Sequence, residues 1–195
     1  NNVKMTNKNK RDLLMKVLMV RYEEYWQDIV RFLRGIGVKN PLTEQNFCSY
    51  PYLHEQRRNY DYVDNHKYWD HPSFGGKQWG LPMYFLSESA LAHRARLPKW
   101  LGNSRVFGKP YTVTEMNFCY PNSYRAEGTL LYAAVAGLQD WDGMYHYNYS
   151  DGLSRMFAKG TQQLRIFDIC NDMARLIPAR IGTVLFLRRD VAPAT

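Results

Sequence analysis

Short runs of β-branched and aromatic residues alternate about four times with helix-patterned segments along this chain of 195 residues. The clearest run is Tyr111 to Glu115, which follows a Gly-Lys-Pro loop, and others are expected near Leu42, at Tyr60 to His66 and at Met144 to Tyr149. Such residues favour strands. Because the connections are long enough for right-handed crossovers and contain helices, we expect a parallel sheet in an α/β fold.

Two segments have strong helical periodicity. The segment from Arg11 to Leu33 carries apolar residues every three or four positions, and we expect this stripe to face the core. A second helix is predicted from Tyr124 to about Leu138, with Asn122 or Ser123 as its cap. The inward-facing residues predicted for the first are Leu14, Leu18, Tyr22, Tyr25, Ile29 and Leu33, and for the second Leu130, Leu131, Ala134, Val135 and Leu138.

The remaining segments have weaker patterns. Residues 48–58 mix proline, tyrosine and charge without a period, which predicts a loop. We expect a short helix at 87–96 with a turn near Trp100, one or two short helices within 162–177, and a helix at 180–189.

Composition limits the classes of function. Hydrophobic residues make up 45% and aromatic residues 15% of the chain, enough to bury the core of one domain. Flat aromatic rings also cover the apolar faces of sugars. The net charge is +8 and the isoelectric point about 9.4, which invites a nucleic-acid interpretation. The basic residues are scattered rather than gathered in one stripe, so nucleic-acid binding is the least favoured class.

The cysteines and the hydropathy give no sign of a disulfide framework, a metal site or a membrane span. Cys48, Cys119 and Cys170 are an odd number without CxxC spacing. No apolar run approaches the roughly 20 residues that cross a bilayer. The chain begins Asn1-Asn2, so we expect it to be a piece of a longer protein, and its localisation is not predicted.

Three predicted strands end in polar or aromatic groups that suit one pocket. His66 and Tyr68 follow one strand, Glu115 and Asn117 end the next, and Tyr147 lies at the end of the last. Parallel neighbours place their carboxyl ends on one rim. A carboxylate beside a tyrosine and a histidine, with tryptophans nearby, is the ensemble that a glycosidase needs. The alternatives are a solvated loop glutamate and a histidine satisfied in the core.

Three segments together resemble a known superfamily. They are Asp64-Asn65-His66-Lys67-Tyr68-Trp69, Gly108-Lys109-Pro110-Tyr111-Thr112-Val113-Thr114-Glu115-Met116-Asn117 and Leu138-Gln139-Asp140-Trp141-Asp142-Gly143. This pattern resembles the C-terminal half of the TIM-barrel retaining glycoside hydrolases often called clan A, which include β-galactosidases, cellulases, mannanases and agarase-like enzymes. The resemblance implies that residues 1–195 are a single partial domain, about the second half of a (β/α)8 barrel, with strands five to eight and their helices.

The resemblance also assigns roles. Glu115, at the end of the seventh strand, would be the nucleophile, and Tyr68, His66 and Asn117 would support it. No cofactor and no metal are implied, and the implied ligand is a carbohydrate substrate. The side chains expected to contact the sugar are Trp69, Trp79, Trp141 and Tyr147, although the tryptophans fit core packing equally well.

One element of the superfamily is missing from the sequence. The acid/base glutamate follows an asparagine at the end of the fourth strand, and this chain contains no Asn-Glu pair. Retaining hydrolysis needs two carboxyl groups about 5 to 5.5 Å apart. We therefore expect the acid/base in the missing N-terminal half of the barrel, and no turnover by this piece alone. The alternative functions are a non-catalytic carbohydrate-binding barrel and, last, a basic nucleic-acid-binding domain.

Overall fold

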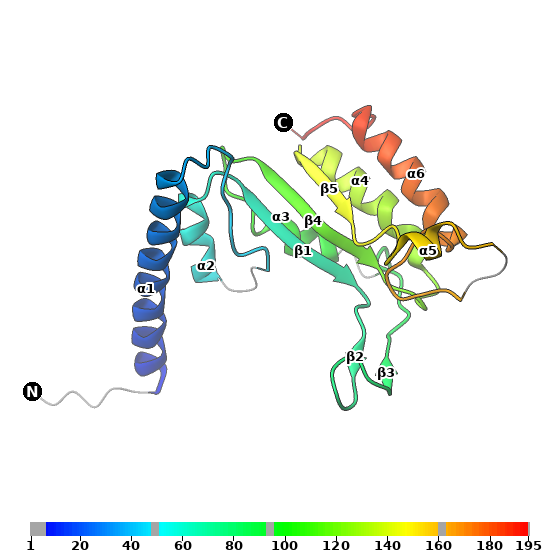
Figure 1. The fold of residues 1–195 in the computed structure, drawn as a ribbon, viewed down its shortest axis with the longest axis horizontal. Helices are drawn as coiled ribbons and strands as arrows, with labels where there is room; N and C mark the ends of the chain where they lie inside the picture. The colour runs from blue at the N-terminus through cyan, green and yellow to red at the C-terminus, as the bar shows by residue number, and fades with distance from the viewer. Residues whose placement is uncertain (1–6, 48–50, 93–95, 160–162, 195) are drawn as a thin grey trace, which may run out of the picture.

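The computed structural model describes residues 7–47, 51–92, 96–159 and 163–194, which form helices and a small parallel sheet (Figure 1). The helices are α1 (Asn7–Gly35), α2 (Pro51–Gln56), η1 (Arg57–Asn59), α3 (Arg96–Gly102), η2 (Arg125–Glu127), α4 (Gly128–Leu138), α5 (Leu153–Met156) and α6 (Met173–Leu187). The strands are β1 (Val63–Trp69), β2 (Ser73–Phe74), β3 (Met83–Tyr84), β4 (Tyr111–Phe118) and β5 (Gly143–His146).

The main sheet is parallel and has the order β1-β4-β5. This confirms the predicted α/β class and three of the four expected strands, with β1 beginning and β4 ending three residues later than expected. Strands β2 and β3 form a separate antiparallel hairpin that projects from the end of β1 (Figure 1).

The strand expected near Leu42 is absent from the structure, and that prediction was wrong. The segment still lies beside the start of β1, because Asp61 N donates to Leu42 O at 2.9 Å and Thr43 Oγ1 donates to Tyr62 O at 2.6 Å. Gln45 has a φ of 58°, which is incompatible with extended pairing, so the segment accompanies β1 without joining the sheet.

The core lies between the sheet and the helices α3 and α4, and α6 packs against α4 (Figure 1). Its fully buried side chains from the sheet are Val63, Tyr111, Val113, Met116 and Phe118, and from the helices and loops Leu97, Leu101, Tyr132, Ala136 and Trp141.

The most deeply buried face of helix α4 is offset from the one that its leucines predicted, although Leu131 and Val135 are partly buried and pack against the core as expected. The buried residues are Gly128, Thr129, Tyr132, Ala133 and Ala136, whereas Leu138 is 47% exposed. Small residues face inward because α4 is packed between the sheet and α6. A Cβ added to Gly182 of α6 would lie 2.9 Å from the carbonyl oxygen of Thr129, so the two helix backbones approach too closely for a larger residue.

Helix α1 was predicted correctly as a helix but not in its burial. Leu14 and Leu18 are 56% and 50% exposed, and Trp26 is the one buried residue of the helix. Trp26 packs edge-on against Tyr60, with ring centroids 4.7 Å apart. In Figure 1, α1 stands beyond the β1 edge of the sheet, and α2 lies between them. Most of the apolar stripe of α1 therefore has no cover within the described residues.

Three weaker predictions need correction. Residues 51–59 form α2 and η1 instead of a loop, while 48–50 lie outside the described residues. The helix expected at 87–96 is absent from 87–92; 93–95 are not described, and α3 starts only at Arg96. Residues 163–172 are irregular, because their carbonyl groups bind the side chain of Arg175, and α6 begins at Met173 instead of 180.

Candidate functional site

Glu115 is placed by a bulge in the central strand. In the parallel register Asn65 pairs with Val113 but His66 pairs with Glu115, so Thr114 is an extra residue in β4. A bulge re-aims the residues that follow it. Val113 and Met116 remain in the core, while Thr114 and Glu115 both lie on the face that the helices leave uncovered. We call this the open face and define it by Asp64, His66, Tyr68, Thr112, Thr114 and Glu115.

Both oxygen atoms of the Glu115 carboxylate are held from the neighbouring strand. The hydroxyl of Tyr68 donates a hydrogen bond to Oε1, and Nδ1 of His66 lies 2.8 Å from Oε2. The Glu115 side chain is 27% exposed, so it is fixed without being sealed off. Contacts to both oxygens fix the orientation of the carboxylate. The structure thus brings together the three residues that the sequence predicted on one rim.

An aromatic wall stands at the carboxyl end of β1, centred on Phe167. The Phe167 ring lies 5.3 Å from the Tyr68 ring, 5.7 Å from Tyr147, 5.8 Å from His71 and 5.9 Å from Trp79. Trp79 is 51% exposed. Two of the predicted sugar contacts, Trp79 and Tyr147, therefore lie in one exposed wall beside Tyr68.

The other two predicted sugar contacts lie elsewhere. Trp69 points to the helix side of β1, where its ring stacks on Phe118 at 6.0 Å and its Nε1 donates to Glu88 O. Trp141 is buried in the core between Tyr111 and Tyr132. Both tryptophans pack on the opposite side of the sheet from Glu115, and neither reaches the open face.

Asn117 is a structural connection rather than a surface group. It is fully buried, and its side-chain amide donates hydrogen bonds to the backbone carbonyls of Tyr147 and Phe167. Its Oδ1 accepts from Arg175 at 3.3 Å. Asn117 therefore ties the two segments that carry the aromatic wall to the end of β4.

Arg175 of helix α6 also holds the segment that carries Phe167 in place. Its buried guanidinium pairs with Asp172 at 2.7 Å and donates to the carbonyl oxygens of Arg165, Ile166 and Asp168. Burial lowers the pKa of Arg175, and the Asp172 carboxylate opposes that shift. Burial raises the pKa of Asp172, but the hydrogen bonds and charges of Arg125 and Arg175 bring the net value below its usual range. This ion pair fixes the loop that presents Phe167.

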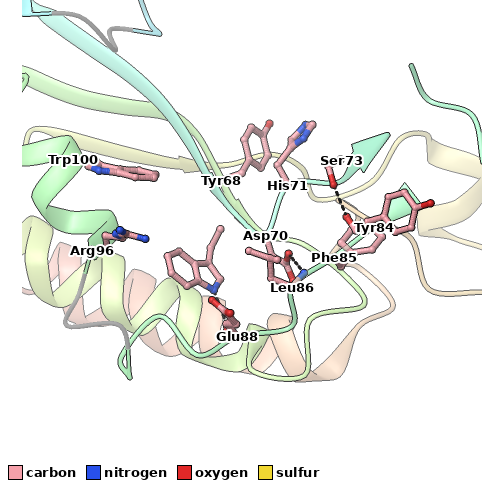
Figure 2. Close-up of a pocket in the computed structure, with 11 residues that line it drawn as sticks. Tyr68, Asp70, His71, Ser73, Tyr84, Phe85, Leu86, Glu88, Arg96 and Trp100 are labelled. Atoms are coloured by element: carbon pink, nitrogen blue, oxygen red, sulfur yellow. Dashed lines mark hydrogen bonds between the residues drawn. The ribbon is translucent and has the colours of Figure 1, made fainter. Parts of the chain in front are cut away.

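A cavity of about 330 Å³ adjoins the site at the end of β1 (Figure 2). Figure 2 shows Trp100 and Arg96 at one end of it and Ser73 and Tyr84 at the other. Only Tyr68 and His71 are shared between this cavity and the surroundings of Glu115 described above. Its lining residues are Tyr68, Trp69, Asp70, His71, Ser73, Tyr84, Phe85, Leu86, Glu88, Arg96 and Trp100.

Hydrogen bonds of Asp70 hold together the segments that line the cavity. The Asp70 carboxylate accepts from the backbone N–H groups of Leu86 and Ser87 at 2.7 and 2.8 Å, and from the amide of Asn122 at 3.0 Å. These hydrogen bonds hold the segment that follows the β2–β3 hairpin against the end of β1. The walls are mainly aromatic with a few polar groups, which is the usual composition of a small-molecule site.

Three residues of the site were missed by sequence reasoning. Phe167 lies in a segment whose apolar residues predict a helix, and Arg175 belongs to the same segment. Asp64 was noted in the pattern but given no role, although it lies directly beneath His66. The alternation of β1 was the available signal, because Asp64, His66 and Tyr68 are two residues apart and share one face.

No protein-family model, no curated protein and no solved structure matched this chain in the comparisons made with it. Among the described residues, no group of three or more histidine, cysteine or acidic side chains is placed to hold a metal ion. Within the same residues no helix is long and apolar enough to span a bilayer. The Cys119 and Cys170 thiols are free.

Proposed function

We propose that this chain is part of a retaining glycoside hydrolase, with Glu115 as the nucleophile. The observation that carries the proposal is the Glu115 carboxylate on the open face, held by the Tyr68 hydroxyl at one oxygen and His66 Nδ1 at the other. A nucleophilic carboxylate must be fixed in orientation, and these two contacts hold both of its oxygen atoms.

The reaction would proceed by double displacement. Glu115 attacks the anomeric carbon through an oxocarbenium-like transition state while the aglycone leaves with a proton from the acid/base, and water then hydrolyses the glycosyl ester. The wall of Phe167, Trp79 and Tyr147 offers flat rings for the apolar faces of a sugar beside Tyr68. The neighbouring cavity is large enough for a further sugar unit.

We further propose that the α/β unit is the second half of a (β/α)8 barrel, with β1, β4 and β5 as its sixth, seventh and eighth strands. In such barrels the helices cover the outer face and the chemistry lies at the carboxyl ends of the strands. The parallel order and the helices on one face agree with that arrangement. An N-terminal half would carry the acid/base and cover the exposed stripe of α1.

A non-catalytic carbohydrate-binding barrel is the second candidate. One observation favours it: the other carboxylate of the open face, Asp64, is buried and occupied by three donors, so it is not placed to protonate a leaving group. On this alternative the protein binds oligosaccharides through its aromatic wall without cleaving them.

The test is an activity assay on the protein as its full gene encodes it, with a panel of aryl glycosides. We expect hydrolysis by the unchanged protein and its loss in Glu115→Gln. Glu55→Gln is the matched control, because Glu55 lies on α2 in an exposed ion pair with Arg58. Retained hydrolysis in Glu115→Gln would refute the nucleophile assignment, and binding without hydrolysis by the unchanged protein would favour the second candidate.

A further inference from the structure

Beneath the Glu115 site, Asp64 forms a second anchored carboxylate. It is 4% exposed, and it accepts hydrogen bonds from the Thr112 hydroxyl at 2.6 Å, the Thr114 hydroxyl at 2.6 Å and the Thr114 backbone N–H at 3.0 Å. All three donors come from β4, so the Asp64 side chain joins the two strands on the open face.

Nε2 of His66 faces two oxygen atoms, and the number of protons available to them determines whether it carries a hydrogen. An ionised carboxylate only accepts, and a threonine hydroxyl has one proton to give. The Thr114 proton therefore goes to Asp64, which leaves the Thr114 oxygen as an acceptor. Nε2 of His66 lies 3.0 Å from this oxygen and 3.4 Å from Oδ2 of Asp64. Both neighbours accept, so Nε2 carries a hydrogen.

The other ring nitrogen, Nδ1, also faces an acceptor. Nδ1 of His66 lies 2.8 Å from Oε2 of Glu115, and a carboxylate there accepts as well. With both carboxylates ionised, Nδ1 also carries a hydrogen. A neutral imidazole has one N–H, and only the imidazolium form donates from both nitrogens.

We propose that His66 is an imidazolium held between the Asp64 and Glu115 carboxylates, and that Asp64 is the positioning residue that keeps it there. The part of this inference that concerns catalysis rests on the proposed function of Glu115. Asp64 does not touch the reacting atoms. It orients the ring so that Nδ1–H points at Oε2, and it balances the positive charge from the far side.

The surrounding groups are compatible with this charge arrangement. Tyr68 on β1 donates to Glu115, and Thr112 and Thr114 on β4 are neutral donors. Burial and then the Asp64 carboxylate raise the pKa of the nearby Tyr62, so this phenol adds no charge at neutral pH. Tyr145 of β5 is a second phenol, which interacts with Tyr62. The cluster Asp64⁻, His66⁺ and Glu115⁻ has a net charge of −1, which favours a cationic transition state.

In the double displacement, the imidazolium would act chiefly in the second step. When water attacks the anomeric carbon and gives a proton to the acid/base, the bond between that carbon and the Glu115 oxygen breaks and its electron pair returns to the carboxylate. The charge that develops there is stabilised by the Nδ1–H donor, and no proton leaves His66. A charged donor matched to a developing carboxylate is stronger than a neutral one.

The direct test is ¹⁵N–¹H correlation spectroscopy of the histidine rings in the uniformly ¹⁵N-labelled protein at pH 7. The sequence contains five histidines, and His66→Gln identifies the signals of His66. We expect protons on both ring nitrogens of His66 in the unchanged protein and on one in Asp64→Asn. The matched control is Asp61→Asn, which removes an exposed aspartate paired with Arg34 and should leave His66 doubly protonated.

The spectra test the protonation state of His66 and the role of Asp64 separately. A singly protonated His66 in the unchanged protein overturns the proposal that His66 is an imidazolium. This result needs no variant, so it can be obtained even if Asp64→Asn does not fold. A His66 that stays doubly protonated in folded Asp64→Asn overturns the role of Asp64. None of these spectra depends on glycosidase activity.

A kinetic readout tests the positioning role separately. In Asp64→Asn we expect kcat to fall roughly tenfold with little change in KM, because the lost interaction acts on the reacting carboxylate rather than on substrate binding. An unchanged kcat, or a rise in KM in place of the fall in kcat, contradicts the positioning role. If the unchanged protein hydrolyses no glycoside, the proposed function fails while the spectra still decide the state of His66.

Discussion

The hydroxyl of Tyr68 donates a hydrogen bond to Glu115 Oε1 across the pair of parallel strands β1 and β4. Tyr68 does not pair directly with Glu115 in the register; it pairs with Asn117, two residues further on. The bulge at Thr114 turns Glu115 onto the face of His66 and Tyr68, and the length of the tyrosine side chain spans the offset of two residues. The contact therefore depends on a backbone irregularity that no propensity scale describes.

Tyr68→Phe should lower kcat without unfolding the protein. The change removes one donor from an ionised carboxylate, and hydrogen bonds to charged groups contribute roughly 1.5–3 kcal/mol, equivalent to about 10- to 100-fold in rate. Kinetics on an aryl glycoside substrate, with circular dichroism as a folding check, measure the effect. Tyr124→Phe, at an exposed tyrosine before η2, is the control and should leave kcat unchanged. Equal rates for Tyr68→Phe and the unchanged protein would argue against this donor.

Arg175→Met should destabilise the fold by about 3–5 kcal/mol, because it leaves Asp172 as a buried carboxylate without this partner and several carbonyl groups without a donor. Urea unfolding followed by tryptophan fluorescence gives the free energy of unfolding. Arg180→Met, on the exposed side of the same helix, should change it by less than about 0.5 kcal/mol. A similar small loss in both variants would mean that the buried network contributes little.

Gly182→Ala should lower the melting temperature, because its Cβ would meet the carbonyl oxygen of Thr129 at 2.9 Å and separate α6 from α4. Overpacking of this kind costs about 1–3 kcal/mol. Gly35→Ala, where a Cβ meets nothing within 4 Å, is the matched control and should be neutral or slightly stabilising. Calorimetry of the two variants distinguishes the close helix contact from a general intolerance of alanine.

Stability should fall on acidification between about pH 6.5 and pH 4 because of His146. Burial first, and then the positive charge of Arg175, lower the pKa of His146 to about 4. In the unfolded chain this histidine takes up a proton at its ordinary pKa of about 6.5, so in that interval the unfolded state binds more protons and gains stability relative to the folded state. The expected loss is on the order of 2–3 kcal/mol.

His146→Gln tests this dependence. The variant should lose less stability than the unchanged protein when urea midpoints are compared at pH 7 and pH 4.5. Carboxylates such as Asp172, whose pKa is lowered, contribute their own loss as the pH falls further. Parallel pH profiles for the two proteins would show that His146 is not the source of the loss above pH 4.

The three strands of the parallel sheet and the central triad of the site followed from sequence because both depend on local pattern, whereas β2 and β3 were not predicted. Aromatic and β-branched runs marked β1, β4 and β5, and the parallel pairing of β1 with β4 brings His66, Tyr68 and Glu115 together on the open face, within the strands rather than at the predicted rim. The positions of Trp69 and Trp141 did not follow. A strand residue faces one side or the other according to the register, and a loop tryptophan has no period at all, so composition did not distinguish a core ring from a surface ring.

The larger misses arose from contacts distant in sequence. Helix α4 buries alanine, glycine and tyrosine because α6 covers it, and its leucines gave no sign of that neighbour. The loop around Phe167 is irregular because Arg175 binds its carbonyl groups, although its residues alone favour a helix. The apolar stripe of α1 predicted burial, but the described chain supplies little to cover it.

Covalent trapping of Glu115 tests the central claim most directly. The reagents are 2-deoxy-2-fluoro glycosides with a dinitrophenolate leaving group, which needs no acid catalyst, so the trap reports the nucleophile even where the acid/base is not supplied. Applied as a panel of sugars to the protein encoded by the full gene, they should give an adduct that peptide mass spectrometry locates on Glu115 and that Glu115→Gln does not form. An adduct on a different carboxylate, or none with any sugar of the panel, would contradict the assignment of Glu115 as the nucleophile.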